Sequence, residues 1–162
     1  MGKQICVIGN AEPTPEQYEI AIEVGRIVAQ VGHVSITGGR SGVMEAVARG
    51  AHIEGGISVG ILPSDDMKDS NDFNTINIPT GMGYTRNALN IYAADVVLIV
   101  GGATGTLNEM TFAWMYGKPM YAIEGSGGYG EQWIGKGFDD RRADVVRGVS
   151  LDNLKCLLED LD

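Results

Sequence analysis

The hydrophobic pattern of the chain alternates between short apolar runs and segments of helical periodicity. Uninterrupted apolar runs indicate strands buried on both faces, and apolar residues spaced three and four apart indicate helices. The runs predict strands at Lys3–Gly9, Val34–Thr37, Ile57–Leu62, Asp95–Val100 and Lys118–Ile123, with weaker strands at Thr75–Ile78 and Val145–Val146. The helical segments follow Thr14, span Val43–Glu54 and Tyr84–Ala93, follow the turn at Gly101–Gly105, and span Leu151–Leu161.

This alternation predicts the fold class: an α/β domain with a Rossmann-like three-layer α/β/α arrangement and a mostly parallel sheet. The length of 162 residues fits one domain, so residues 1–162 are expected to form a single unit. In such sheets, ligands bind at the carboxyl ends of the strands, where the strand order switches. The turns after Gly9, Thr37 and Val100 belong on that edge, and their convergence predicts a pocket.

Glycine clusters at these turns are the main chemical signal. Of the 162 residues, 24 are glycine, roughly twice the ordinary share. Glycine permits positive φ and close approach of a ligand, and a helix that follows directs unpaired N–H groups at the turn. The turns therefore predict a site for a phosphorylated small molecule, most simply a nucleotide. The expected binding residues are Gly9, Asn10, Gly38, Gly39, Ser41, Gly42, Gly101, Gly102, Ala103, Thr104, Gly105 and Thr106.

Two of these features have simpler explanations. The turn at Gly101–Gly105 is also typical of an ordinary strand-to-helix connection, in which Thr106 and Glu109 form a capping box. Arg86 lies in the expected first turn of a helix, where a cation is unfavourable. That placement indicates an anionic partner, either a ligand phosphate or a carboxylate such as Glu109. The alternative is an ordinary surface arginine.

Composition narrows the class of partner. The net charge of −9 disfavours nucleic acid polymers and anionic membranes, and no apolar run reaches the roughly 20 residues of a membrane span. With no secretory signal, the protein is expected to be cytoplasmic. Cys6 and Cys156 are interpreted as buried apolar residues, and the isolated His33 and His52 predict no metal site. Charged or glycine-rich composition predicts mobile loops at Ser64–Asp72 and Gly125–Gly137.

The order of these motifs resembles the LOG (Lonely Guy) group of the SLOG superfamily, long misannotated as lysine decarboxylases. The resemblance rests on Gly38-Gly39, the run Gly42–Ala46, Arg86 and the sequence GGATGTLNE at 101–109. The group's signature is P-G-G-x-G-T-x-x-E, with an Arg-Lys pair upstream. Gly101 replaces its proline, Ala103 its second glycine, and Asn87 the lysine. This version is similar to a bacterial subfamily that resembles molybdenum cofactor carrier proteins.

The resemblance implies two functions. One is a phosphoribohydrolase that cleaves a nucleoside 5′-monophosphate to free base and ribose 5-phosphate, with Arg86 and Glu109 as catalytic residues. The other is a carrier or sensor that holds a nucleotide or a molybdopterin-type ligand without turnover. Neither requires a further cofactor or a metal. Decarboxylation is disfavoured because no lysine lies in a glycine turn to bind pyridoxal phosphate. The resemblance also implies a homodimer, with the helices that begin near Arg86 and Thr106 at its interface.

Overall fold

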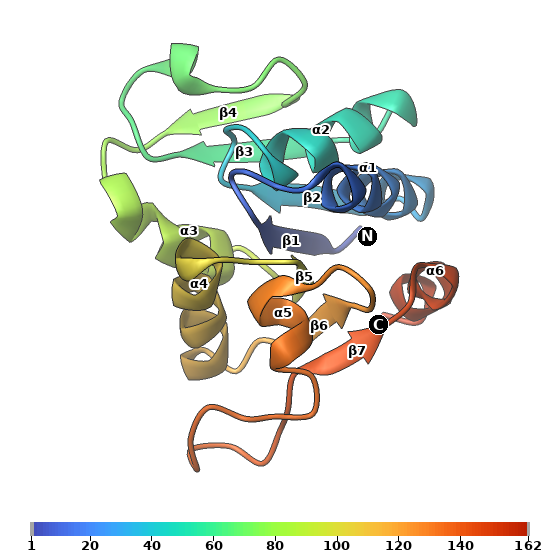
Figure 1. The fold of residues 1–162 in the computed structure, drawn as a ribbon. Coiled ribbons are helices and arrows are strands. Elements are labelled where there is room, and N and C mark those ends of the chain that lie inside the picture. Colours follow the sequence, from blue (N-terminus) through green and yellow to red (C-terminus); the bar gives the residue numbers. More distant parts are fainter. Residues whose placement is uncertain (1, 162) are drawn as a thin grey trace.

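The computed structural model describes residues 2–161, whose strands form one seven-stranded parallel sheet (Figure 1). The order across the sheet is β4-β3-β2-β1-β5-β6-β7. The strands are β1 (Gln4–Gly9), β2 (Val34–Thr37), β3 (Ser58–Leu62), β4 (Ile76–Pro79), β5 (Val96–Val100), β6 (Met120–Ile123) and β7 (Arg147–Val149). The predicted fold class is therefore confirmed, and the sheet is parallel throughout.

Helices cover both faces of this sheet (Figure 1). On one face lie α1 (Pro15–Gln30), α2 (Val43–Ile53) and α6 (Leu151–Glu159); on the other lie α3 (Asn87–Tyr92), α4 (Thr104–Met115) and α5 (Gly128–Gln132). The central strand β1 supplies both cores, because Ile5 and Val7 point to the first face while Cys6 and Ile8 point to the second. This explains why β1 is apolar at successive positions instead of at alternate ones.

The predicted start of α1 is also found. Thr14 accepts a hydrogen bond from the Gln17 backbone at 3.2 Å, and the Gln17 side chain accepts one from the Thr14 backbone at 3.0 Å. This reciprocal capping box, with Pro15 at the first helical position, fixes where the chain leaves β1 and turns into α1. Among residues 2–161, no helix is long and apolar enough to cross a membrane.

Some local predictions were wrong. The segment Gly125–Gly137 was expected to be a loop, but it contains α5, because the Glu131 carboxylate accepts hydrogen bonds from the N–H groups of Gly125 (2.9 Å) and Gly127 (2.7 Å) and closes the preceding turn. Cys156 is exposed, since the buried positions of α6 are Leu154 and Leu158.

Two element boundaries also differ from the prediction. The helix expected over Tyr84–Ala93 is a 3-10 turn over Gly83–Arg86 followed by α3. The last strand is Arg147–Val149, and Val146 makes only an isolated parallel bridge to Ile134. The first difference matters for the site, because it places Arg86 where the 3-10 turn passes into α3.

The strand order reverses at β1, which has β2 on one side and β5 on the other. The chain proceeds outward from β1 to β4, then returns to the centre with β5. The crevice outside the carboxyl ends of β1 and β5 is thus the switch point at which ligands bind in this fold class. It is flanked by the turn after β2 and by the start of α4.

Candidate functional site

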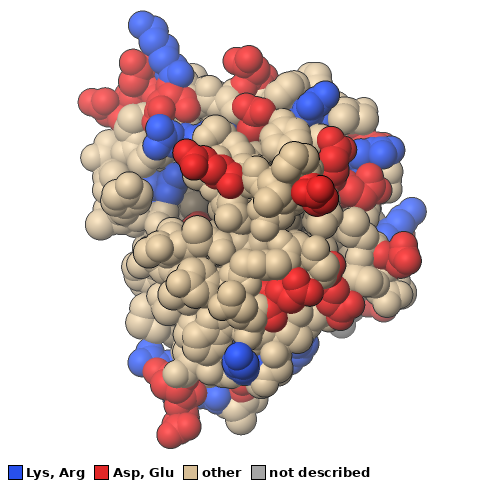
Figure 2. Space-filling model, viewed as in Figure 1, with Lys and Arg blue, Asp and Glu red and all other residues tan. Residues whose placement is uncertain are grey.

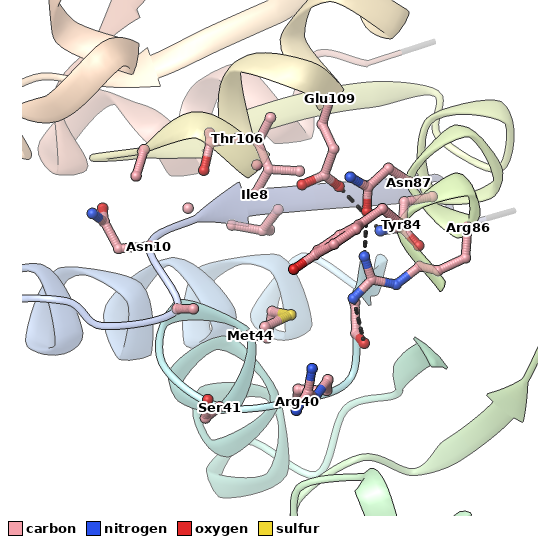
Figure 3. Close-up of a pocket in the computed structure, with 17 residues that line it drawn as sticks. Ile8, Asn10, Arg40, Ser41, Met44, Tyr84, Arg86, Asn87, Thr106 and Glu109 are labelled. Atoms are coloured by element: carbon pink, nitrogen blue, oxygen red, sulfur yellow. Dashed lines mark hydrogen bonds between the residues drawn. The ribbon is translucent and has the colours of Figure 1, made fainter. Parts of the chain in front are cut away.

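A cleft of about 300 Å³ lies at this switch point (Figure 3). Four segments line it: the end of β1 with Asn10, the turn after β2, the 3-10 turn and α3, and the first two turns of α4. The cleft therefore brings together the segments that the sequence singled out. Of the predicted site residues, it is lined by Gly9, Asn10, Gly38, Ser41, Arg86, Ala103, Gly105, Thr106 and Glu109.

Asn10 links the two main glycine turns. Its side-chain oxygen Oδ1 accepts a hydrogen bond from the Gly102 N–H at 2.6 Å, and its backbone carbonyl accepts one from the Val43 N–H at 2.9 Å. Asn10 thus holds the start of α4 and the start of α2 at a fixed separation across the cleft. Asn10 was expected to bind a ligand, but both of its oxygen atoms accept hydrogen bonds from the protein itself.

The first turn of α4 presents unpaired backbone donors. Its N-cap residue is Ala103, which offers no side-chain acceptor. Within residues 2–161, the N–H groups of Thr104, Gly105 and Thr106 make no hydrogen bond. Such donors, together with the positive end of the helix dipole, bind an anion.

The N–H groups of the two glycines before that turn form hydrogen bonds within the protein. The Gly101 N–H donates to Ser126 Oγ at 3.0 Å, and the Gly102 N–H is held by Asn10. Both glycines have positive φ, 64° and 116° respectively, so they shape the turn and do not line the cleft. Thr104 lies beside a neighbouring hollow instead of the cleft.

In the turn after β2, likewise, some glycines shape the backbone and another lines the cleft. Gly39 and Gly42 have φ of 80° and 73°, and neither lines the cleft. A side chain at Gly42 would collide with the backbone carbonyls of Asn10 and Ala11. Gly38 does line the cleft, and a side chain there would collide with the Arg86 guanidinium. The glycines at 38 and 42 are therefore needed for close packing.

Glu109 lies in the second turn of α4 with its carboxylate at the cleft (Figure 3). The alternative of a capping box with Thr106 was wrong, because α4 begins three residues earlier than that pairing requires. Oε2 accepts a hydrogen bond from Asn90 Nδ2 at 3.0 Å. Burial raises the pKa of Glu109 to about 7, against the opposing effects of the Asn90 hydrogen bond and the charge of Arg86.

Arg86 is buried, with 7% of its surface exposed. Its Nε donates to the Ile61 carbonyl at 2.8 Å, its Nη2 to the Gly38 carbonyl at 3.2 Å, and its Nη1 to Asn87 Oδ1. The alternative of a surface arginine was wrong. Burial lowers the pKa of Arg86, and the negative charge of Glu109 partly offsets that effect. The two side chains influence each other across the cleft without forming an ion pair within 4 Å.

Several lining residues were not found from the sequence. Arg40 lies inside the GGRSG turn. Asn90 follows Arg86 by four residues, so Arg86 and Asn90 lie on one side of the same helical segment. That spacing could have revealed Asn90. Asn87 donates to Asn108 Oδ1 at 3.0 Å and so connects α3 to α4. Tyr84 lines the same cleft and is 87% exposed.

The fold and this cleft define a class: a doubly wound α/β protein whose switch-point cleft is lined by the start of a helix, one buried arginine and one carboxylate of raised pKa. Residues 2–153 match the model of the SLOG cluster4 family. The chain belongs to the SLOG cluster4 family.

Individual relatives agree with this assignment. An uncharacterized protein of Archaeoglobus fulgidus is 46% identical over 122 residues, covering 75% of this chain and 80% of the relative. The cytokinin riboside 5′-monophosphate phosphoribohydrolase of Mycobacterium tuberculosis is 30% identical over 132 residues, covering 74% and 70%. The solved structure of the molybdenum cofactor binding protein from Rippkaea orientalis is 37% identical with a TM-score of 0.74, covering 76% of this chain and 77% of that one.

Proposed function

We propose that this protein hydrolyses the N-glycosidic bond of a nucleoside 5′-monophosphate and releases the free base and ribose 5-phosphate. The observation that carries the proposal is the position of Glu109, which faces the cleft and caps no helix. A carboxylate with a pKa of about 7 is suited to exchange a proton at neutral pH. The relationship to the phosphoribohydrolase of M. tuberculosis supports this reaction.

In this proposal, the N–H groups of Gly105 and Thr106, which line the cleft, bind the 5′-phosphate. Glu109 follows Gly105 by four residues, about one helical turn or roughly 6 Å along the axis, so the carboxylate lies on the sugar side of a phosphate bound at the start of the helix. Cleavage of the C1′–N bond leaves its electron pair on the base and positive charge on the sugar. Glu109 stabilises that charge and accepts a proton from the water whose oxygen bonds to C1′. The departing base takes up a proton from solvent, and Glu109 returns its proton to solvent.

The test is Glu109→Gln, which keeps the shape of the side chain and removes its charge. We expect this variant to bind adenosine 5′-monophosphate while its release of ribose 5-phosphate falls by ~10²-fold or more. Glu159→Gln, at an exposed position of α6, is the matched control and should match the wild type. If the wild type releases no ribose 5-phosphate from any common monophosphate, hydrolysis is refuted.

A second function is a carrier that binds a molybdopterin-type ligand or a nucleotide without turnover. The relationship to the molybdenum cofactor binding protein supports it, as does Asn87, which stands where the hydrolase signature has lysine. Mass spectrometry of small molecules released from natively purified protein distinguishes the two, because adenosine monophosphate and a pterin differ in mass. A bound pterin together with no hydrolysis would establish the carrier.

We also propose that the protein is a homodimer through the outer faces of α3 and α4. Figure 2 shows few charged side chains over these helices. Exposed apolar residues gather there, including Tyr92 and Tyr116, whose rings stack at 4.1 Å, and Met115. A hollow of about 400 Å³ beside Tyr84 and Phe112 continues this surface to the edge of the cleft. Light scattering should give twice the chain mass, and Tyr116→Arg should give the monomer; a monomeric wild type would refute the dimer.

A further inference from the structure

The charged groups of the cleft raise the question of which cation contacts an anionic ligand. Arg86 is poorly placed for it, because all three of its guanidinium nitrogens donate to protein oxygens. Turning the guanidinium toward a ligand would break bonds to the Ile61 and Gly38 carbonyls and leave buried acceptors unpaired, which is costly. Arg86 therefore supports the cleft wall and contributes its charge from behind it.

Arg40 is the other arginine that lines the cleft. It lies across the cleft from Glu109 and Thr106 (Figure 3). Its side chain is 51% exposed, and its Nε lies 3.3 Å from the Asp69 carboxylate, which is its ion-pair partner. Exposed ion pairs of this kind are weak and exchange readily. Arg40 can therefore change partner at low cost, whereas Arg86 cannot.

The backbone that carries Arg40 is held firmly by the segment after Asp69. Asn71 donates from Nδ2 to the Arg40 carbonyl at 2.9 Å and to the Gly39 carbonyl at 3.1 Å. Asn74 Nδ2 donates to the same Gly39 carbonyl at 2.9 Å. The turn is thus fixed at its main chain while the Arg40 side chain stays half exposed. The same loop therefore supplies the two asparagines that hold the turn and the Asp69 carboxylate that pairs with Arg40.

We propose that Arg40 is the residue that contacts the anionic group of the ligand, and that Asp69 competes with the ligand for it. The inference rests on the proposed binding of a phosphorylated ligand in the cleft. A phosphate offers the Arg40 guanidinium two oxygens in a bidentate arrangement and carries more charge than the Asp69 carboxylate. Arg40 and Arg86 are also close enough that the charge of Arg40 contributes to lowering the pKa of Arg86. An anion beside Arg40 relieves that repulsion.

The competition makes the site selective for charge. A neutral nucleoside does not attract the Arg40 guanidinium away from Asp69, whereas a dianionic phosphate does. Asp69 therefore lowers the affinity for every phosphorylated ligand by the strength of its ion pair. The loop that carries it, expected from sequence to be mobile, becomes part of the specificity of the site.

The experiment measures binding of adenosine 5′-monophosphate and of adenosine by titration calorimetry. Arg40→Gln should weaken monophosphate binding roughly tenfold or more, the range for a lost hydrogen bond to a charged group. Its matched control is Arg147→Gln, which removes an equally exposed, ion-paired arginine far from the cleft. Asp69→Asn should strengthen monophosphate binding about two- to fivefold, which corresponds to an exposed ion pair. Its control is Asp72→Asn, the same charge change in the same loop at an exposed residue.

Each outcome decides the inference. Adenosine binding should not change in any variant, so equal weakening of adenosine by Arg40→Gln would show that Arg40 shapes the cleft and does not contact the anion. Equal effects of Asp69→Asn and Asp72→Asn would refute the competition. If Arg40→Gln and Arg147→Gln both bind the monophosphate as the wild type does, Arg40 is no ligand contact, although the proposed function stands. If the wild type binds no monophosphate, the proposed function fails and this inference with it.

Discussion

Substituting Gly105 by alanine separates ligand binding from folding more cleanly than any other change in the glycine turns. Gly105 is the second residue of α4 and does not have positive φ. Apart from its chain neighbours and the backbone of the same helix, no described atom lies within 4 Å of a Cβ atom built there. Alanine is favoured over glycine in a helix by up to about 1 kcal/mol, so Gly105→Ala should leave the free energy of unfolding unchanged or raise it.

The same methyl group would stand beside the N–H groups proposed to bind phosphate. If the ligand approaches this backbone, the methyl group displaces it and weakens a hydrogen bond to a charged group, which is worth about 1.5–3 kcal/mol. That corresponds to a loss of affinity of roughly tenfold to a hundredfold. Urea unfolding measures the stability, and calorimetry with adenosine 5′-monophosphate measures the binding.

Gly39→Ala is the contrasting variant. Gly39 has φ of 80°, and a Cβ atom there would lie 2.6 Å from Leu62 Cδ2 and 3.0 Å from the Gly60 Cα. This substitution should destabilise the fold by about 1–3 kcal/mol through backbone strain alone. Unchanged affinity in Gly105→Ala, with a stability at or above that of the wild type, would show that the ligand does not approach the start of α4.

Two further predictions concern Glu109 and the loop at Ser64–Asp72. Because burial raises the pKa of Glu109 to about 7 in the folded state, the folded protein holds this proton more tightly than the unfolded chain, so stability should fall as the pH rises from about 4.5 to about 7. Urea unfolding across that range should show a fall in the wild type that Glu109→Gln lacks; parallel curves would contradict the raised pKa. Hydrogen exchange should be fastest in Ser64–Asp72, apart from the N–H groups of residues 68–71, which are hydrogen-bonded within the protein. Protection equal to that of β5 throughout Ser64–Asp72 would refute the mobility of this loop.

The strands and the position of the cleft could be predicted because they depend on local signals. Buried strands such as β5 are apolar at every position, and a parallel sheet then places the glycine turns on one edge. The ends of short helices could not be predicted in the same way. The turn before α5 depends on Glu131 bonding to N–H groups four and six residues earlier, a contact that no periodicity reports.

The roles of the polar residues were harder to predict, because they depend on partners distant in sequence. Asn10 was expected to bind a ligand, and its oxygen atoms bond to Gly102 and Val43. The position of Arg86 was informative, yet its partners include the carbonyls of Gly38 and Ile61, 48 and 25 residues away. Sequence spacing identifies which side chains meet at the cleft, and only the three-dimensional contacts show which of them keep a free donor.

The absence of the signature lysine has a structural counterpart. Asn87, at that position, accepts a hydrogen bond from Arg86 and donates one to Asn108, so a neutral side chain joins α3 to α4 where a cation would stand. The cleft therefore has one positive charge fewer on that wall, next to a carboxylate that burial already makes costly to ionise. In the proposed arrangement, Arg40 supplies the missing charge from the opposite wall, on the turn after β2. The anion is then held between Arg40 and the start of α4, and Glu109 faces it with Asn90 as its one hydrogen-bond donor among residues 2–161.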